Sequence, residues 1–338
     1  MRSLSLFSWF LVAGLICVGA CAGTMSSNEI DDIVEHRVQA GGGEVRRNEK
    51  LPGRPIYGVS WFNGKAMTEG DFQAISQLDH LAYLNISGFA LPDRSLIRFF
   101  EAIGNDRVRN LSLNVCETLT LPAILKISQQ RQLVDLSLGG SNIDDSGLIA
   151  LSKMTQLQRL ILFRTPITDA GIKHLGKLKN LRLLDLTQNE LSDEGLKGLA
   201  DLSQLETLMI GKLGVELSIT DRGVASLEGL TKLKSLSLRD TQITDESIKS
   251  FAKFQHLESL GIDQAKITDR GLERIAQFKN LKRLGLGQTL ITNDSVPLLS
   301  TMTNLKELWL FRTKVTDEGI ASLRKSLPNC VINGEVSK

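Results

Sequence analysis

Histidine and cysteine are the side chains of this sequence most suited to catalysis or metal binding, and their spacing opposes both roles. The chain contains four of each type. His80 and His256 occupy equivalent positions of a sequence repeat, seven steps apart, which is roughly 35 Å at ~4.8 Å per step. The sequence also lacks a phosphate-binding glycine loop, a nucleophile elbow and the Cys/His spacing of zinc sites. We therefore expect no catalytic residue, no metal site and no cofactor.

A column of aspartates is the second arrangement that resembles a metal site. A series of calcium sites needs several carboxylates per turn and glycine-dense loops, which this sequence does not supply. A residue able to cap a helix precedes each aspartate, and a negative charge is favourable in the first helical turn. The sequence therefore predicts helix capping rather than calcium binding. The column consists of Asp145, Asp169, Asp193, Asp221, Asp245, Asp269 and Asp317.

These aspartates belong to a sequence repeat that extends over most of the chain. The pattern L-x-x-L-x-L recurs, usually every 24 residues, and is followed by a second signature such as Ile167-Thr168-Asp169-Ala170-Gly171. Alternating apolar residues predict a short strand, and the spacing of Ile172, Leu175 and Leu178 predicts a helix. The first pattern begins at Leu81, Val108, Leu133, Leu157, Leu181, Leu205, Leu233, Leu257, Leu281 and Leu305.

Stacked strands of such a repeat form one parallel sheet, in which side chains alternate between the core and the outside. We expect Leu160 and Leu162 to point inward, and Arg159, Ile161 and Phe163 to point outward. Because helices are wider than strands, they take the outer arc. The expected fold is an α/β solenoid, a curved horseshoe of about 10–11 repeats with the parallel sheet on the concave side and the helices on the convex side.

The two signatures together resemble the leucine-rich-repeat family, over roughly residues 54–334. The nearest subclass is the T-x-I-T-D-x-G-L repeat of exported bacterial proteins, and similar repeats occur in F-box adaptors. The resemblance implies a non-enzymatic module that binds a protein partner. Residues 23–53 are expected to form a linker and cap, and residues 335–338 a short tail.

Small or polar residues follow the strands, where the backbone turns. Their hydroxyl and amide groups are suited to hydrogen bonding with the turning backbone. Cys116 fits this column as a small, weakly polar group, and its distance from Cys330 at the other end of the array excludes a disulfide between them. The column runs through Cys116, Ser141, Thr165, Asn189, Thr241, Thr289 and Thr313.

The first 22 residues are typical of an export signal. Arg2 is followed by an uncharged, mainly apolar stretch from Leu4 to Val18 and by small residues before Cys21. This segment resembles a bacterial lipobox, in which Cys21 is lipidated. Plain secretion after cleavage and an uncleaved membrane anchor are the alternatives. We expect a protein of the cell envelope or exterior, attached to a membrane only by a lipid or an uncleaved signal.

Charge argues against nucleic acid as a partner. Lys and Arg total 40 against 38 Asp and Glu, and the basic residues are scattered along the chain. We expect a monomer that binds a protein partner.

Two groups of outward-facing strand residues are candidates for that binding. Exposed apolar clusters and aromatic residues beside arginine are typical of interaction sites. For both groups the alternative is mutual covering of neighbouring side chains, with Trp309 lying across Gly261 and Gly285. The first group is Arg159, Ile161, Phe163, Arg164, Leu183 and Met209; the second is Trp309, Phe311 and Arg312, with Arg283 on the preceding strand.

One connection is four residues longer than its counterparts, in the segment 211–218. Insertions of this kind often lie on the binding side of a repeat protein, but they are also tolerated without a function. The sequence therefore leaves three candidate functions. They are an exported protein-binding scaffold, a structural envelope lipoprotein without a dedicated ligand and, as a remote alternative, an F-box-type substrate adaptor of a ubiquitin ligase.

Overall fold

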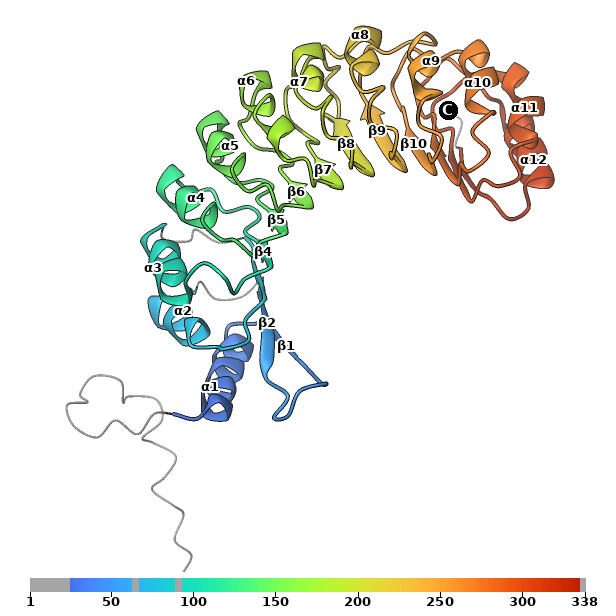
Figure 1. Cartoon of the computed structure of the whole chain (residues 1–338). Coiled ribbons are helices and arrows are strands. Elements are labelled where there is room, and N and C mark those ends of the chain that lie inside the picture. Colours follow the sequence, from blue (N-terminus) through green and yellow to red (C-terminus); the bar gives the residue numbers. More distant parts are fainter. Residues whose placement is uncertain (1–24, 63–66, 89–92, 335–338) are drawn as a thin grey trace, which may run out of the picture.

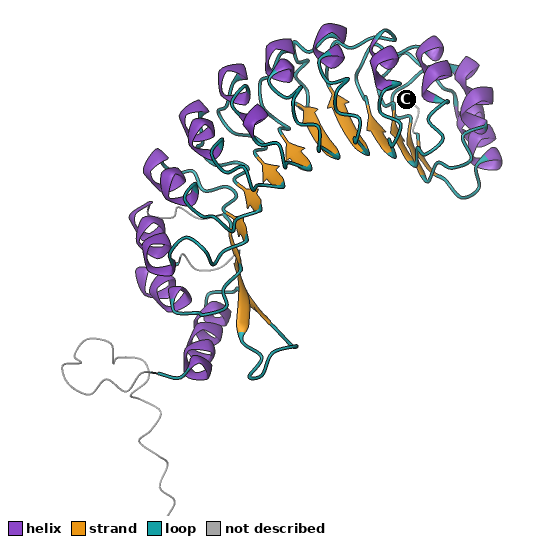
Figure 2. Cartoon of the chain, in the orientation of Figure 1, coloured by secondary structure: helices purple, strands orange, loops and turns teal. Residues whose placement is uncertain are grey.

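The computed structural model describes residues 25–62, 67–88 and 93–334, which form one curved array (Figure 1). The strands line the inner arc and the helices stand on the outer arc (Figure 2). The strands are β1 (Glu44–Arg47), β2 (Ile56–Trp61), β3 (Tyr83–Ile86), β4 (Asn110–Ser112), β5 (Asp135–Ser137), β6 (Arg159–Ile161), β7 (Leu183–Asp185), β8 (Thr207–Gly211), β9 (Ser235–Arg239), β10 (Ser259–Gly261), β11 (Arg283–Gly285), β12 (Glu307–Trp309) and β13 (Val331–Asn333).

The helices are short, as expected for a repeat of 24 residues. They are α1 (Ser27–Ala40), α2 (Glu69–Ser76), α3 (Asp93–Ile103), α4 (Leu121–Ile127), α5 (Asp145–Leu151), α6 (Asp169–Ile172), α7 (Asp193–Lys197), α8 (Asp221–Ala225), α9 (Ser247–Phe251), α10 (Asp269–Ile275), α11 (Val296–Ser300) and α12 (Asp317–Ser326), with the 3-10 helices η1 (Leu175–Lys177) and η2 (Asn293–Ser295).

The strands follow one another across a single 13-stranded sheet in the order of the sequence. β1 is antiparallel to β2, whereas the following pairs, from β2–β3 to β12–β13, are parallel. Neighbouring strands are aligned by one repeat, so that Leu160 is in register with Leu184 and Leu184 with Leu208. The predicted solenoid with a concave sheet and convex helices is therefore confirmed.

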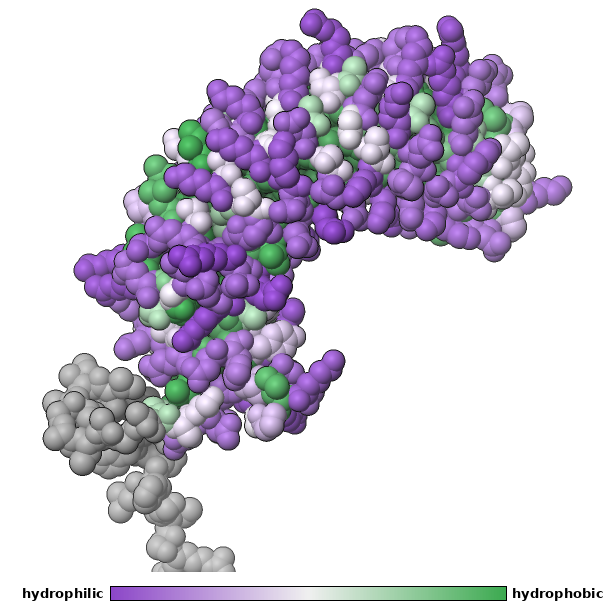
Figure 3. All heavy atoms as spheres, viewed as in Figure 1, coloured by the Kyte–Doolittle hydropathy of each residue, from purple (hydrophilic) through white to green (hydrophobic). Residues whose placement is uncertain are grey.

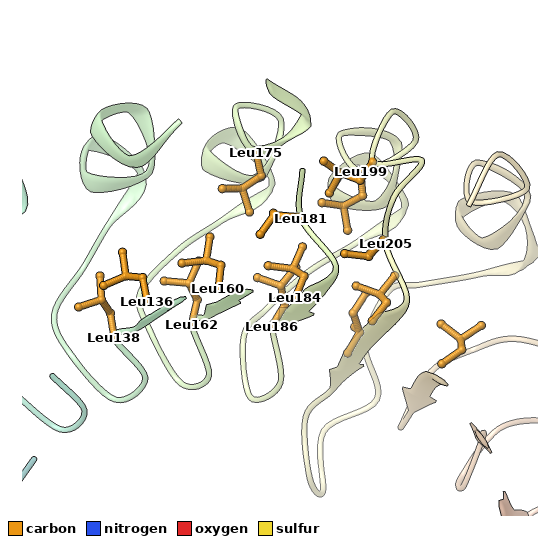
Figure 4. Packing of buried hydrophobic residues seen from close by; sticks show 14 of the residues in the cluster. Leu136, Leu138, Leu160, Leu162, Leu175, Leu181, Leu184, Leu186, Leu199 and Leu205 are labelled. Atoms are coloured by element: carbon orange, nitrogen blue, oxygen red, sulfur yellow. The ribbon is translucent and has the colours of Figure 1, made fainter. Parts of the chain in front are cut away.

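Layers of leucine fill the space between the sheet and the helices. Leu160, Leu184 and Leu208 are all fully buried on successive strands. Leu175 and Leu199 reach toward this row from the convex side, so each repeat contributes the same small set of contacts to one continuous core (Figure 4). Burial of each leucine contributes about 1.5–3 kcal/mol to stability. The predicted inward strand positions are thereby confirmed.

The N-terminal end of the core is covered by α1 and β1. Val34 and Val38 of α1 are fully buried, and Trp61 at the end of β2 is 2% exposed. Asp31, also buried, accepts a hydrogen bond from the backbone N–H of Ile56 at 2.8 Å. An apolar helix face and one buried carboxylate thus close the open end that a repeat array leaves.

The C-terminal end carries a strand that the sequence does not predict. The ten predicted repeats correspond to β3–β12, β2 precedes them, and β13 follows them. Its pattern is hidden because Asn329 and Gly334 stand where other repeats have apolar residues. Arg324 Nη2 donates to the Ile332 carbonyl at 3.3 Å. This guanidinium covers a backbone acceptor at the free edge, which opposes edge-to-edge pairing.

A residue in the left-handed conformation follows most strands. Its N–H donates to the next repeat; that of Arg164, for example, meets the Thr187 carbonyl at 2.9 Å. Left-handed backbone suits glycine and asparagine, whereas a β-branched residue there is strained. The positions are Gly88, Val115, Gly140, Arg164, Gln188, Asp240, Gln264, Gln288 and Arg312.

Val115, at φ 58°, is the β-branched member of this column. Val115→Asn is expected to raise the free energy of unfolding by about 0.5–1 kcal/mol, because asparagine tolerates a backbone that costs other residues ~1–2 kcal/mol. Urea denaturation measures the change. Gly140→Ala is the matched control: at φ 68° it adds a side chain to the same backbone, so it should lower stability. Equal signs for the two variants would contradict the explanation.

Within the described ranges, no helix combines the length and apolarity needed to cross a bilayer. The predicted export signal at residues 1–22, with Cys21, lies outside those ranges.

Candidate functional site

The aspartate column links each repeat to the next along one flank. The two carboxylate oxygens of Asp145 accept from the backbone N–H and the hydroxyl of Thr168, at 2.8 and 2.6 Å. The Thr168 hydroxyl in turn accepts from the Ala170 N–H, which confirms the predicted helix cap. We name this series the Asp–Thr ladder. Its further pairs are Asp93–Thr120, Asp169–Ser192, Asp193–Thr220, Asp221–Thr244, Asp245–Thr268, Asp269–Thr292 and Asn293–Thr316.

The glycine of the second signature leaves room for the ladder carboxylate. A β-carbon on Gly171 would lie 2.2 Å from Asp145 Oδ1. Serine replaces this glycine in two repeats, and there its hydroxyl donates to the carboxylate, as Ser247 does to Asp221 and Ser295 to Asp269. Aspartate, threonine and glycine of the signature are therefore required by one contact between repeats, which sequence reasoning had attributed to each helix alone.

The serine contacts make stability depend on pH in the acidic range. Burial of Asp221 opposes its ionisation, but the hydrogen bonds from Ser247 and Thr244 outweigh it, and the pKa falls below the ordinary value. The pKa of Asp269 is lowered in the same way. A depressed folded-state pKa gives stability that is present above the ordinary value of about 3.9 and is lost as the pH falls through the folded value.

Ser247→Ala is accordingly expected to lower the free energy of unfolding by about 1 kcal/mol near neutral pH, since one hydrogen bond to a carboxylate is lost. The deficit should disappear once Asp221 is protonated in the folded protein. Urea denaturation from neutral pH down to about pH 2 follows it, because the range must extend well below the ordinary aspartate pKa of about 3.9 to reach the lowered folded-state value. Ser326→Ala, whose hydroxyl donates to the Ser322 carbonyl in α12, should show no such pH dependence. A deficit that persists unchanged in acid would refute the coupling.

The polar column behind the strands has the predicted role. The hydroxyl of Thr165 donates to the Leu162 carbonyl at 2.9 Å, and the amide of Asn189 donates to the same carbonyl at 2.8 Å. Cys116 is fully buried, and its Sγ lies 3.8 Å from the carbonyl oxygen of Ile86. Cys116 and Cys330 do not form a disulfide with each other, as expected.

The first candidate group does not form one continuous apolar patch. Asp185 of β7, which is buried, lies in register between Ile161 and Met209 and separates them. Arg159 lies 3.6 Å from Asp135 and lines, with Ile161, a shallow hollow of about 210 Å³ that extends toward β3. Leu183 is half-buried on β7, and Arg164 is exposed in the turn after β6.

Two phenylalanines of the candidate groups cover glycines of the preceding repeat. A β-carbon on Gly139 would lie 2.0 Å from the ring of Phe163, and one on Gly287 would lie 2.3 Å from the ring of Phe311. Both rings are half-buried by this contact. Mutual covering therefore describes these two side chains. Little of the Phe163 ring is left exposed for contact with a partner.

Mutual covering of side chains would place Trp309 across Gly261 and Gly285, but its surroundings are different. The atoms nearest to a β-carbon at Gly285 belong to Asp263, and those nearest to one at Gly261 belong to Ser237 and Arg239. The indole is half-buried and stands at one end of a groove across β8–β12. We call this 340 Å³ depression the concave groove; it is lined by Met209, Ser235, Leu236, Ser237, Arg239, Ser259, Leu260, Gly261, Asp263, Gly285, Trp309 and Phe311.

An ion pair forms part of the groove wall. Arg239 Nε lies 3.1 Å from Asp263 Oδ2, and Asp263 Oδ1 accepts from the Gly287 N–H at 2.9 Å. Burial raises the pKa of the Asp263 carboxyl, although Arg239 and the Gly287 amide oppose the rise. This pair was not predicted from the sequence. Their spacing of one repeat, 24 residues with opposite charge, was the available signal.

The remaining candidates lie around the groove. Arg283 is exposed at the start of β11, and its Nε donates to Ser259 Oγ at 3.3 Å. Arg312 is exposed in the turn after β12. The longer connection 211–218 exposes Leu213, whose side chain is 72% exposed.

Comparison with known proteins identifies the repeat. A family model described as "Leucine Rich repeat" matches residues 130–152, 177–200 and 229–252. A chain of the Rad7–Elc1 complex from yeast is 19% identical, with a TM-score of 0.61 over 79% of this chain and 71% of that one.

An internalin from Listeria monocytogenes is also 19% identical, with a TM-score of 0.51 over 92% of this chain and 90% of that one. Such distant similarity establishes the fold. No curated protein matches the sequence. Three segments of the chain therefore match the leucine-rich repeat, and the 24-residue period and the continuous parallel sheet agree with the fold of that repeat.

Proposed function

We propose that the chain is a non-enzymatic scaffold that holds a protein partner against its concave sheet. The observation that carries this proposal is the concave groove, where Trp309 and Met209 flank a floor of serine and glycine. Aromatic and sulfur side chains around small residues are typical of protein-binding surfaces. Elsewhere the visible surface is mainly hydrophilic, with hydrophobic residues in small groups (Figure 3).

The test compares the same substitution on opposite faces. Ile161 is half-buried on the concave side, and Ile149 is 47% exposed on α5 of the convex side. Each is changed to aspartate in the full chain, Trp309→Asp is added as a second concave variant, and partners are captured from native extract and identified. If partners bind the concave side, Ile161→Asp and Trp309→Asp should lose partners that Ile149→Asp retains. Partner sets that match in all three variants would contradict it.

We further propose that the protein works outside the cytoplasm, anchored by a lipid on Cys21. The support is the sequence of residues 1–22, and secretion after cleavage or retention of the signal are the competing outcomes. Mass spectrometry of the mature N-terminus separates the three. A structural lipoprotein without a dedicated ligand would share the lipid but show no partner lost in the concave variants.

The adaptor alternative has weaker support. A chain of the yeast complex shares the fold at 19% identity. The residues of this chain from α1 to β1 pack over the end of the core.

A further inference from the structure

One cation beside the concave groove has no ion-pair partner among the residues that the structure describes. Arg283 is exposed and its Nε donates to Ser259 Oγ at 3.3 Å, while its terminal guanidinium nitrogens form no ion pair with any described residue. Of the nearby acids, Glu258 forms its ion pair with Lys282 at 2.8 Å and interacts with Arg283 at longer range, and Glu307, although in register with Arg283, forms no ion pair with it. A planar guanidinium that is exposed and forms no ion pair is suited to bind a carboxylate.

The floor of the groove admits a main chain. A β-carbon at Gly261 would have only ordinary contacts, the nearest at 3.5 Å to Ser237 Oγ. Glycine at an open position on a sheet allows a ligand backbone to approach closely. At ~4.8 Å between strands, the distance from β8 to β12 is about 19 Å, the length of roughly six extended residues.

The ends of the groove differ from its floor. Met209 stands on β8 and Trp309 on β12, and both present apolar surface to the space between them. Arg283 lies on β11, next to the strand that carries Gly261 and about two residues, or 7 Å, along the strand direction from it, which is within reach of an acidic side chain on a segment that crosses Gly261. The charge and the apolar surface therefore belong to neighbouring subsites.

We propose that the concave groove binds an extended peptide segment that carries a carboxylate beside an apolar side chain. The carboxylate pairs with Arg283, the apolar side chain packs against Trp309, and the main chain crosses Gly261. This inference rests on the proposed scaffold function and specifies its ligand.

Random 12-residue peptides displayed on phage and selected on the full chain provide the probe. Selection on the wild-type protein is expected to enrich Asp or Glu next to an apolar residue. Selection on Arg283→Glu should instead enrich Lys or Arg, because the charge of the subsite is reversed. Arg182→Glu, which changes an exposed arginine on the flank, should leave the wild-type preference intact.

Gly261→Val distinguishes a blocked groove from an unfolded chain. Valine suits a strand and its β-carbon makes only ordinary contacts here, so the midpoint of thermal unfolding should stay the same or rise. Fluorescence polarisation with a selected peptide should nevertheless show at least a tenfold weaker Kd, a threshold of about 1.4 kcal/mol.

The inference is overturned if no acidic preference appears, or if selected peptides bind Gly261→Val and Arg283→Glu as tightly as the wild type. Failure of the scaffold function is a separate result. If Ile161→Asp loses a native partner while Gly261→Val keeps it, the scaffold stands and the peptide groove is rejected. If no concave variant affects any native partner, the scaffold itself fails.

Discussion

Replacing Gly223 by alanine is expected to destabilise the protein by roughly 2–4 kcal/mol, although alanine normally strengthens a helix by about 1 kcal/mol. The new β-carbon would lie 2.3 Å from Asp193 Oδ1 and 3.0 Å from Asp193 Cα, so moving the carboxylate alone does not remove the clash. Displacing it breaks the bonds that Asp193 accepts from the N–H and hydroxyl of Thr220, both at 2.7 Å. Urea denaturation followed by circular dichroism measures the loss.

Gly70→Ala is the matched control for this variant. Gly70 also lies in the first turn of a helix, α2, but its nearest non-local atom would be 3.6 Å from the added carbon. There the helix preference acts alone, and stability should rise by about 0.5–1 kcal/mol. If both variants change stability in the same direction, the Asp–Thr ladder is not the reason for glycine at position 223.

Trp61→Ala is expected to cost about 3–5 kcal/mol, because it empties the space of a large buried side chain. The indole is 2% exposed and lies where a β-carbon on Gly41 would be, 2.0 Å from its Cζ2. It therefore joins α1 to the first parallel strand. Because each repeat contacts only its neighbours, the damage should be local, with amide hydrogen exchange faster from β1 to β4 than from β10 to β12.

Trp309→Ala is the corresponding control on the concave surface. Its indole is half-buried beside the groove, and its loss should cost much less than that of Trp61. Equal losses for the two tryptophans, or faster exchange in β10–β12 of the Trp61 variant, would show that the N-terminal cap does not have the role described.

The fold could be predicted because repetition multiplies a weak signal. A single L-x-x-L-x-L segment is ambiguous, but ten copies fixed both the strands and the inward positions of residues such as Leu160. The signal failed at the last strand, where Asn329 and Gly334 remove the pattern that the backbone still follows. There the hydrogen bonds offered by β12 determine the strand more than the side chains do.

The candidate surface was harder to predict because contacts across strands decide which outward residues are free. Phe163 and Trp309 are both aromatic and outward-facing in the sequence, but one ring covers Gly139 and the other borders the groove. The carboxylate of Asp185 between Ile161 and Met209 was visible in the sequence as an outward position. Its effect on the patch depends on register, which becomes certain only in the structure.

The Asp–Thr ladder has a consequence for how such a chain can evolve. Each repeat offers a carboxylate to the repeat after it and a threonine to the repeat before it, so a tandem duplication of 24 residues arrives with both bonds complete. An insertion of another length must instead be looped out, as the segment 211–218 is. Unequal recombination can therefore lengthen or shorten the concave wall in steps of ~4.8 Å, changing the reach of the binding surface while keeping the fold.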